Sequence, residues 1–290
     1  MRGNLPDLSI RQLEYLVAVA DSPTWAAAAA DVGVSPSALS QGLAELERRV
    51  GVKLFEASGR RRLLRSAAIP VLDHARQVVA LTTDLARWSD RLRTAQSGSV
   101  RLGLIDVAAV AHLRDSLRRF RTDRHDVTLT LTVAPSRRLL DQLIDGDLDA
   151  VACVEPPEPR PGIVTEPLLT EGLHVFAPPG QRLGPPEEWG PWVLFPDGSH
   201  TRRLVEDHLR SLGASVVVAA ESHQPDVLRE MVLLGMGWTV LPESQGRVSD
   251  GDAAPGGAHL LDRQLVLARR SGAVSDPAVD ELLERFRRST

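Results

Sequence analysis

Small polar side chains recur along residues 35–50 at a spacing that would place them on one face of a helix. This face would consist of Ser37, Ser40, Gln41, Ala44 and Arg48. The opposite face would be an apolar stripe of Leu39, Leu43, Leu46 and Val50. Gln and Ser side chains can hydrogen-bond to base edges in the major groove of DNA without adding bulk. We therefore interpret the segment as a recognition helix, the alternative being an ordinary amphipathic surface helix.

An alanine-rich stretch before this segment predicts a partner helix that begins at Trp25 and ends at Asp31. Gly33 stands where the connecting turn needs a positive φ. Ser35 supplies an N-cap oxygen, and Pro36 fits the first helical position. The two helices together predict a helix-turn-helix.

Residues 51–64 predict two short strands around a Ser-Gly turn, which would form a wing beside the helix pair. Arg60, Arg61 and Arg62 adjoin this turn. There they could contact a phosphate backbone or enter a minor groove, the alternative being a solvated surface.

A supporting helix is predicted near the beginning of the chain. Ser9 and Gln12 have the spacing of a capping box. The apolar residues that follow at helical period are Leu13, Leu16, Val17 and Ala20.

Over about fifty residues this region resembles the LysR-type transcriptional regulators. The matching segments, in order, are Arg11-Gln12-Leu13, Val17-Ala18-Val19-Ala20, Ala28-Ala29, Val34-Ser35, Ala38-Leu39-Ser40, Leu46-Glu47, Gly51-Val52 and Leu54-Phe55-Glu56. The chain departs from the family at Trp25, where Phe is usual, and at Pro36-Ser37, where Gln-Pro is usual. Gly42 inside the recognition helix costs about 1 kcal/mol relative to Ala.

The resemblance implies a regulator that binds double-stranded promoter DNA and a small-molecule effector, and that pairs with itself as a homodimer or homotetramer. It leaves a contact with RNA polymerase open. The residues expected to contact DNA are Trp25, Ser35, Pro36, Ser37, Ser40, Gln41, Arg48, Arg60, Arg61 and Arg62.

A long helical segment over residues 66–95 follows the predicted DNA-binding domain of residues 1–65. Its small and apolar residues alternate spacings of four and three, as in a coiled-coil seam. The seam consists of Val71, Ala75, Val78, Thr82, Leu85, Ser89 and Leu92. The resemblance makes this the linker helix that pairs two chains, and the alternative is packing against its own domain.

Residues 96–290 change to strands that alternate with helices, which predicts a parallel sheet flanked by helices in an α/β domain. We expect two lobes: lobe I at about 99–165 and 265–290, and lobe II at about 166–264. This part resembles the family's two-lobed effector domain, which is like the periplasmic solute-binding proteins. The matching segments are Gly146-Asp147-Leu148-Asp149, Glu166-Pro167-Leu168-Leu169 and residues 235–242.

The family binds its effector between the lobes, and loops at the carboxyl ends of parallel strands are where such sheets bind ligands. By position, the candidates here are Asp106, Val107, Ala108, Pro135, Ser136, Gly198, Ser199, His200, Thr201, Gly237 and Trp238. Arg202 and Arg203 could add positive charge, whereas Asp106 would repel an anion. An effector with an amino or hydroxyl group near Asp106 is therefore as plausible as a simple carboxylate; alternatively, Asp106 only caps the next helix.

Charge and composition fit this organisation. The chain of 290 residues has a formal net charge of −4, yet residues 1–98 hold 13 Arg or Lys against 10 Asp or Glu, a net of +3. The basic excess thus lies with the predicted DNA-binding domain. The one cysteine, Cys153, excludes a disulfide or a two-cysteine redox switch within one chain.

Other function classes find little support. The chain lacks the common hydrolase, metalloprotease and nucleotide-binding motifs, and its eight histidines show no metal-ligand spacing. We expect no enzyme activity, no metal and no cofactor, and a cytoplasmic location, since neither a membrane-spanning stretch nor a signal peptide is evident. The alternatives are a cytoplasmic small-molecule-binding protein with weak DNA binding, or an enzyme.

Overall fold

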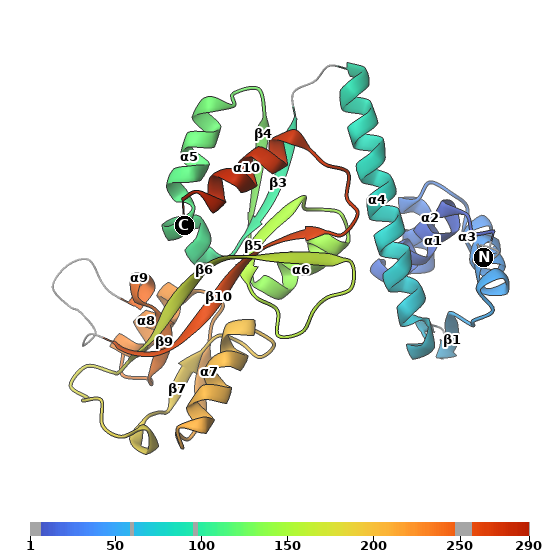
Figure 1. Cartoon of the computed structure of the whole chain (residues 1–290). Coiled ribbons are helices and arrows are strands. Elements are labelled where there is room, and N and C mark those ends of the chain that lie inside the picture. Colours follow the sequence, from blue (N-terminus) through green and yellow to red (C-terminus); the bar gives the residue numbers. More distant parts are fainter. Residues whose placement is uncertain (1–6, 59–60, 95–97, 247–256, 290) are drawn as a thin grey trace, which may run out of the picture. The chain divides into compact units, whose positions relative to one another are not determined.

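The computed structural model describes residues 7–58, 61–94, 98–246 and 257–289, without the side chains of residues 57–58, 61–62 and 91–94. These residues form two compact units (Figure 1). The first contains residues up to 95 with the short segments 144–146 and 272–274, and the second contains the remainder. Among the described helices, none has the length and apolar character needed to span a membrane.

The first unit contains the predicted helix-turn-helix and wing. Its elements are α1 (Ile10–Asp21), α2 (Trp25–Asp31), α3 (Pro36–Val50), β1 (Phe55–Ser58), β2 (Arg61–Leu64) and α4 (Ile69–Thr94). Strands β1 and β2 pair in antiparallel register, while residues 59–60, where the turn was predicted, lie outside the described residues. The helix pair and the two strands are therefore confirmed, with α2 and the start of α3 at the predicted residues.

Local interactions fix the ends of α3. Ser35 Oγ accepts a hydrogen bond from Ala38 N at 3.2 Å, and Pro36 is the first helical residue. Gly33 in the preceding turn has φ of 68°, and Gly51 ends the helix with φ of 74°. Both values lie in the left-handed region that glycine adopts without strain, so the predicted turn is confirmed.

The buried face of α1 is broader than its predicted stripe. Leu13 and Leu16 are buried as expected, but Val17 is only half-buried and Ala20 is exposed. Buried Ala18 and Val19 extend the face instead. The reason is that α1 packs against α2, α3 and α4 together, so residues on more than one side of the helix are covered.

Gly42 has a packing role that the sequence did not reveal. A Cβ atom at this position would lie 2.7 Å from the Tyr15 ring, which belongs to α1. Such a distance is far inside normal contact, so alanine here would displace the ring. The loss of helix propensity at Gly42 is thus the cost of bringing α1 and α3 close together.

The predicted seam along α4 divides into two halves. Ala75 is fully buried in the core of the first unit, and Val71 and Val78 pack against the same core. The predicted pairing role is therefore wrong for Ala75, because packing of α4 against α1 already covers this residue within one chain. Further along, Leu85 is exposed by 52%. The side chain of Leu92 lies outside the described residues.

The second unit is built on a six-stranded sheet in the order β4-β3-β5-β10-β6-β9. Its strands are β3 (Ser99–Leu104), β4 (Thr128–Val133), β5 (Ala150–Val154), β6 (Ile163–Phe176), β9 (Thr239–Pro242) and β10 (Ala258–Arg270). The first three are parallel, but β10 runs antiparallel to β5 and β6, and β9 antiparallel to β6. This sheet is therefore mixed, and within it the prediction of a parallel arrangement holds only for β3, β4 and β5. A separate two-stranded sheet, formed by β7 (Trp192–Leu194) and β8 (Val218–Glu221), is also parallel.

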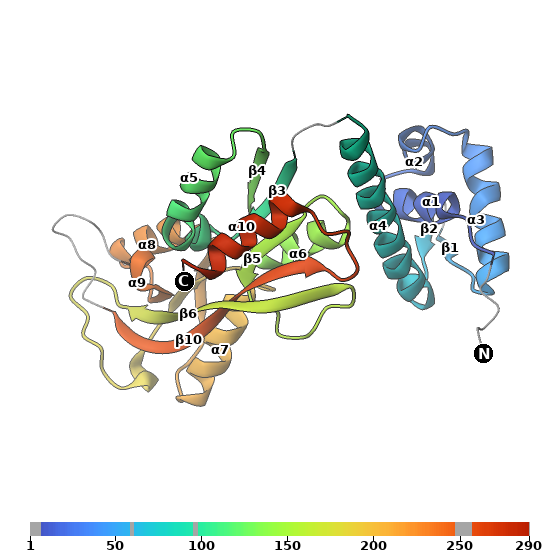
Figure 2. The ribbon, with the colours of Figure 1, turned by 45° about the horizontal axis from the view of Figure 1, so that its top comes forward.

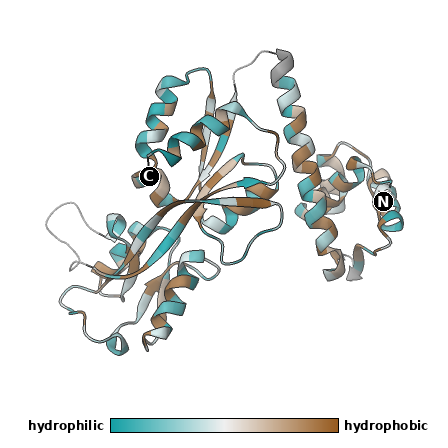
Figure 3. Cartoon of the chain, in the orientation of Figure 1, coloured by the Kyte–Doolittle hydropathy of each residue, from teal (hydrophilic) through white to brown (hydrophobic). Residues whose placement is uncertain are grey.

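Helices complete the two lobes of this unit, as Figure 2 shows. Lobe I has α5 (Arg114–Asp123), α6 (Ser136–Ile144) and α10 (Pro277–Arg287); lobe II has β7 (Trp192–Leu194), β8 (Val218–Glu221), α7 (His200–Ser211), α8 (Pro225–Leu233) and α9 (Glu243–Gly246). In Figure 3, hydrophilic and hydrophobic residues alternate along α5 and α10, as expected of helices with one buried face.

The long strands β6 and β10 pass through both lobes, and this shifts the predicted lobe boundary. Leu168 and Leu169 pack against the core of lobe I, although the sequence placed them in lobe II. Leu260 and Leu261 pack against the core of lobe II. Two continuous strands thus connect the lobes, and the boundary falls within them after Leu169.

Candidate functional site

One face of α3 presents the predicted polar side chains to solvent. Ser37, Gln41, Ala44 and Arg48 are exposed and Ser40 is half-buried. The apolar stripe faces inward, with Leu39 and Leu46 exposed by 0%. The amphipathic division is confirmed, and the exposed side chains can hydrogen-bond to another molecule without disturbing the core.

Charged groups at the end of α3 pair with one another. Arg48 Nη2 lies 2.5 Å from Glu45 Oε1, and Arg49 Nε lies 2.5 Å from the same oxygen. Hydrogen bonds from Arg48 and Arg49 lower the pKa of Glu45 to about 2. Arg48 thus carries a charge that is partly neutralised, and a phosphate would have to compete with Glu45 for it.

Trp25 has a structural contact besides its predicted role. Its ring packs edge-on against Phe55, with ring centroids 5.2 Å apart, so it joins the first turn of α2 to β1. A DNA contact by Trp25 stays a prediction. Arg60 and the side chains of Arg61 and Arg62 lie outside the described residues, so their phosphate contacts stay predictions too.

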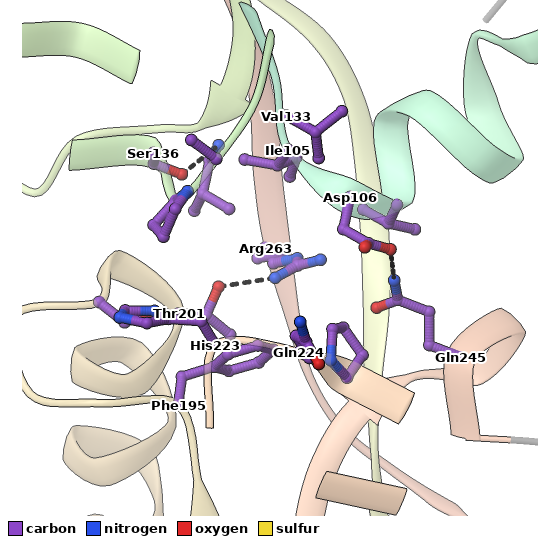
Figure 4. A pocket seen from close by; sticks show the side chains of 16 residues that line it. Ile105, Asp106, Val133, Ser136, Phe195, Thr201, His223, Gln224, Gln245 and Arg263 are labelled. Atoms are coloured by element: carbon purple, nitrogen blue, oxygen red, sulfur yellow. Dashed lines mark hydrogen bonds between the residues drawn. The ribbon is translucent and has the colours of Figure 1, made fainter. Parts of the chain in front are cut away.

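A cavity of about 310 Å³ opens between the two lobes of the second unit (Figure 4). Six of the predicted effector-binding residues line it: Asp106, Val107, Pro135, Ser136, Ser199 and Thr201. They come from the ends of β3 and β4 and from the beginning of α7. The rule that ligands bind beyond the carboxyl ends of parallel strands therefore located this pocket.

Three predicted residues lie in the protein interior instead. Ala108 is exposed by 0% and belongs to the core of lobe I. Trp238 is buried in lobe II near Trp189, where its Nε1 donates to Gln181 Oε1 at 2.8 Å. A Cβ atom at Gly237 would lie 2.5 Å from the Pro191 carbonyl oxygen, so the backbones pack tightly here. These residues support the fold and do not line the pocket.

Gly198 and His200 line a separate cavity of about 560 Å³ together with Arg202 and Arg203. Arg202 donates to Glu206 Oε1 at 2.7 Å, so it does not supply free charge to the effector pocket. His200 Nδ1 lies 3.3 Å from the Val154 carbonyl oxygen, and burial lowers the pKa of His200. The structure therefore divides the predicted loop between two cavities.

Sequence reasoning missed Arg263, the buried cation of the pocket. Arg263 lies on β10 and is exposed by only 4%. Its Nε lies 2.8 Å and its Nη2 2.6 Å from Glu171 Oε2, and Nη1 donates to Thr201 Oγ1 at 2.6 Å. Burial lowers the pKa of Arg263, although the charge of Glu171 opposes this. Arg263 stands between Asp262 and Gln264 in β10, so its neighbours in the sequence gave no signal of its burial.

Glu171 is the counter-ion that makes this burial possible. It lies directly opposite Arg263 in the β6–β10 register. Its Oε1 is also within hydrogen-bond distance of His112 Nε2, at 2.6 Å. Burial would raise the pKa of Glu171, but hydrogen bonding to His112 and the charge of Arg263 outweigh it and lower the pKa. Glu171 is therefore ionised at neutral pH and holds Arg263 in place.

Asp106 and Gln245 face each other across the pocket. Gln245 Nε2, from α9 of lobe II, donates to Asp106 Oδ1 at 2.8 Å, as Figure 4 shows. Burial and then the charge of Asp226 raise the pKa of Asp106, which the Gln245 bond partly offsets. The Asp106 side chain thus links the two lobes through its hydrogen bond with Gln245. This bond differs from the alternative role predicted for Asp106, which was to cap the helix that follows it.

Two family models match the chain. The model "LysR substrate binding domain" matches residues 93–290, and the model "Bacterial regulatory helix-turn-helix protein, lysR family" matches residues 10–68. The first covers the second structural unit, including the pocket, and the second covers α1, α2, α3 and the wing.

Relatives and solved structures agree with these matches. A "Probable hydrogen peroxide-inducible genes activator" of Streptomyces viridosporus is 30% identical over 99% of this chain and 96% of its own length. The "Uncharacterized HTH-type transcriptional regulator YnfL" of Escherichia coli K12 is 30% identical over 83% of this chain and 84% of its own length.

The fold is shared with a full-length OxyR variant from Pseudomonas aeruginosa, with a TM-score of 0.65 and 21% identity over 98% of this chain and 96% of that one. It is also shared with CbnR in complex with its target DNA, with a TM-score of 0.60 and 21% identity over 98% of this chain and 100% of that one. The chain therefore belongs to the LysR family of DNA-binding transcriptional regulators, with an N-terminal helix-turn-helix and a C-terminal substrate-binding domain.

Proposed function

We propose that the exposed polar face of α3 reads promoter DNA and that a small molecule bound in the pocket between the lobes controls the outcome. The observation that carries the first part is the exposure of Ser37 and Gln41 opposite the buried leucines of α3. The second part is supported by a cavity that combines apolar walls with convergent polar side chains, as small-molecule sites do.

We further propose that two chains pair through the exposed half of α4, as a dimer or within a tetramer. Exposed Leu85 and Trp88, on successive turns of this helix, support pairing through its outer half. A basic excess of only +3 before residue 99 favours an assembly that presents more than one DNA-binding unit. In this scheme the effector changes the arrangement of the paired chains, and with it the DNA contacts or the access of RNA polymerase. The regulator would act in the cytoplasm, without catalysis and without a cofactor.

A response to peroxide does not follow from the relatives' names. The single cysteine of the chain, Cys153, lies on β5 and is exposed by 0%. Burial raises its pKa to about 12, so the reactive thiolate is strongly disfavoured. These properties support a small-molecule effector over thiol oxidation as the signal.

Titration of the full chain with the DNA upstream of its own coding region tests this function. We expect affinity for that duplex to exceed affinity for a shuffled duplex of equal length by about 10³-fold or more. Both affinities should fall steeply as salt rises, because phosphate contacts release counter-ions. Equal affinity for the two duplexes at every salt concentration would contradict the proposal.

A further inference from the structure

The charged groups of the effector pocket differ in what they offer a ligand. Arg263 and the hydroxyl groups of Thr201, Ser136 and Ser199 can donate a hydrogen bond, and the Asp106 carboxylate can only accept one. The other polar side chains of the lining, His223, Gln224 and Gln245, can do either. Figure 4 shows the Arg263 guanidinium between Thr201 and Asp106. A ligand that satisfies both Arg263 and Asp106 must therefore carry an acceptor and a donor.

Arg263 keeps donors for a ligand. A guanidinium has five N–H groups. Nε and Nη2 face Glu171 and Nη1 donates to Thr201, so two N–H groups have no partner among the described residues. Arg263 is exposed by only 4% and lines this pocket as well as a second cavity, so a ligand in this pocket can approach its guanidinium. A planar carboxylate, with two oxygen acceptors, fits such a pair of donors.

Asp106 sets the charge that the other end of the ligand must carry. Glu171 already neutralises Arg263, so Asp106 leaves the lining with an excess of negative charge. Asp106 and Arg263 form no ion pair among the described residues, so neither cancels the other directly. Burial and the charge of Asp226 raise the pKa of Asp106, and the described residues form no ion pair with its carboxylate. A ligand ammonium would supply the cation.

From this arrangement we infer that the effector is an amino acid, with its carboxylate on Arg263 and Thr201 and its ammonium on Asp106. This inference rests on the proposed effector role of the pocket. A simple carboxylate would leave Asp106 facing an anion, and a simple amine would leave the Arg263 donors without a partner. The apolar part of the remaining lining includes Ile105, Val107, Val133, Phe195 and Pro225, which favours a ligand with an apolar side chain. His223, Gln224 and Gln245 also line the pocket.

The test is a thermal-shift screen of the full chain with the twenty common amino acids, followed by calorimetric titration. The tightest-binding amino acid is then compared with its deaminated acid and its decarboxylated amine. We expect each analogue to bind about 10- to 100-fold more weakly, because each loses one charged hydrogen-bonding end. If no amino acid binds, or if the deaminated acid binds equally well, the inference is overturned.

Asp106→Asn separates the ammonium contact from the shape of the pocket, since Asn can still accept from Gln245. We expect this variant to lose about 10- to 100-fold in affinity for the amino acid while retaining the deaminated acid. Asp226→Asn is the matched control: it removes a nearby carboxylate that does not line the pocket, and should leave affinity nearly unchanged. Equal losses in the two variants would contradict a direct ammonium contact.

A second screen with metabolites of other classes separates the amino acid class from the effector role of the pocket. If a compound that is not an amino acid binds, and Thr201→Val lowers its affinity, then the effector role of the pocket is supported and the amino acid class is wrong. If no compound binds in either screen, both the inference and the effector role of the pocket fall.

Discussion

Replacement of Glu171 by alanine should destabilise the second unit by about 3–5 kcal/mol, because it leaves the buried Arg263 guanidinium without its counter-ion. Both side chains are almost inaccessible to water, at 6% and 4% exposure, so solvent cannot replace the lost partner. Urea unfolding followed by tryptophan fluorescence measures the change, since Trp189, Trp192 and Trp238 all lie in lobe II.

The double variant Glu171→Ala with Arg263→Met is the control for this result. Removing both charges avoids the unpaired cation, so most of the lost free energy of unfolding should return. A single variant as stable as the wild type, or a double variant no better than the single one, would show that the pair is not structurally important.

Acid should act on the same pair. The native pKa of Glu171 lies below its ordinary value of 4.5, so its stabilising contribution is complete above that pH. The contribution is lost as the pH falls through the lowered native pKa. In the double variant this part of the acid dependence should be absent.

Replacement of Leu85 by aspartate should abolish pairing of two chains and lower the affinity for promoter DNA by about 10²- to 10⁴-fold, the range that linked binding sites usually contribute. Leu85 is exposed by 52% on α4, and a charge there would have to be buried against the partner. Analytical ultracentrifugation and DNA titration report the two effects separately.

Leu85→Met is the matched control, because it keeps an apolar side chain of similar volume at the same position. We expect it to remain paired and to bind DNA like the wild type. If Leu85→Asp also stays paired with unchanged affinity, then the outer half of α4 is not the pairing surface.

The parts of the molecule that depend on local sequence could be predicted well. Ser35, Pro36 and Gly33 determine the ends of α2 and α3 through caps and backbone angles, which need no distant partner. The exposed face of α3 followed from the helical period alone. The ends of parallel strands likewise pointed to Asp106 and Ser136.

The features that the sequence could not reveal depend on contacts between distant segments. Arg263 enters the pocket only because β10 lies beside β6, which brings Glu171 opposite it and α7 within reach. Trp238 was assigned to the effector site by its position in the chain, yet tertiary packing buries its ring. Ala75 fits a coiled-coil period, but α1 covers it first.

The central claim, that α3 reads base sequence, is tested most directly by selecting bound duplexes from a random DNA library. The wild type should select two related half-sites, and Ser37→Ala with Gln41→Ala should relax the preference within each half-site by about 1–3 kcal/mol per lost base contact. Asp73→Ala, an exposed change on α4, should select the wild-type sequences. If the α3 variant also selects the wild-type sequences, then α3 is not the element that reads the DNA.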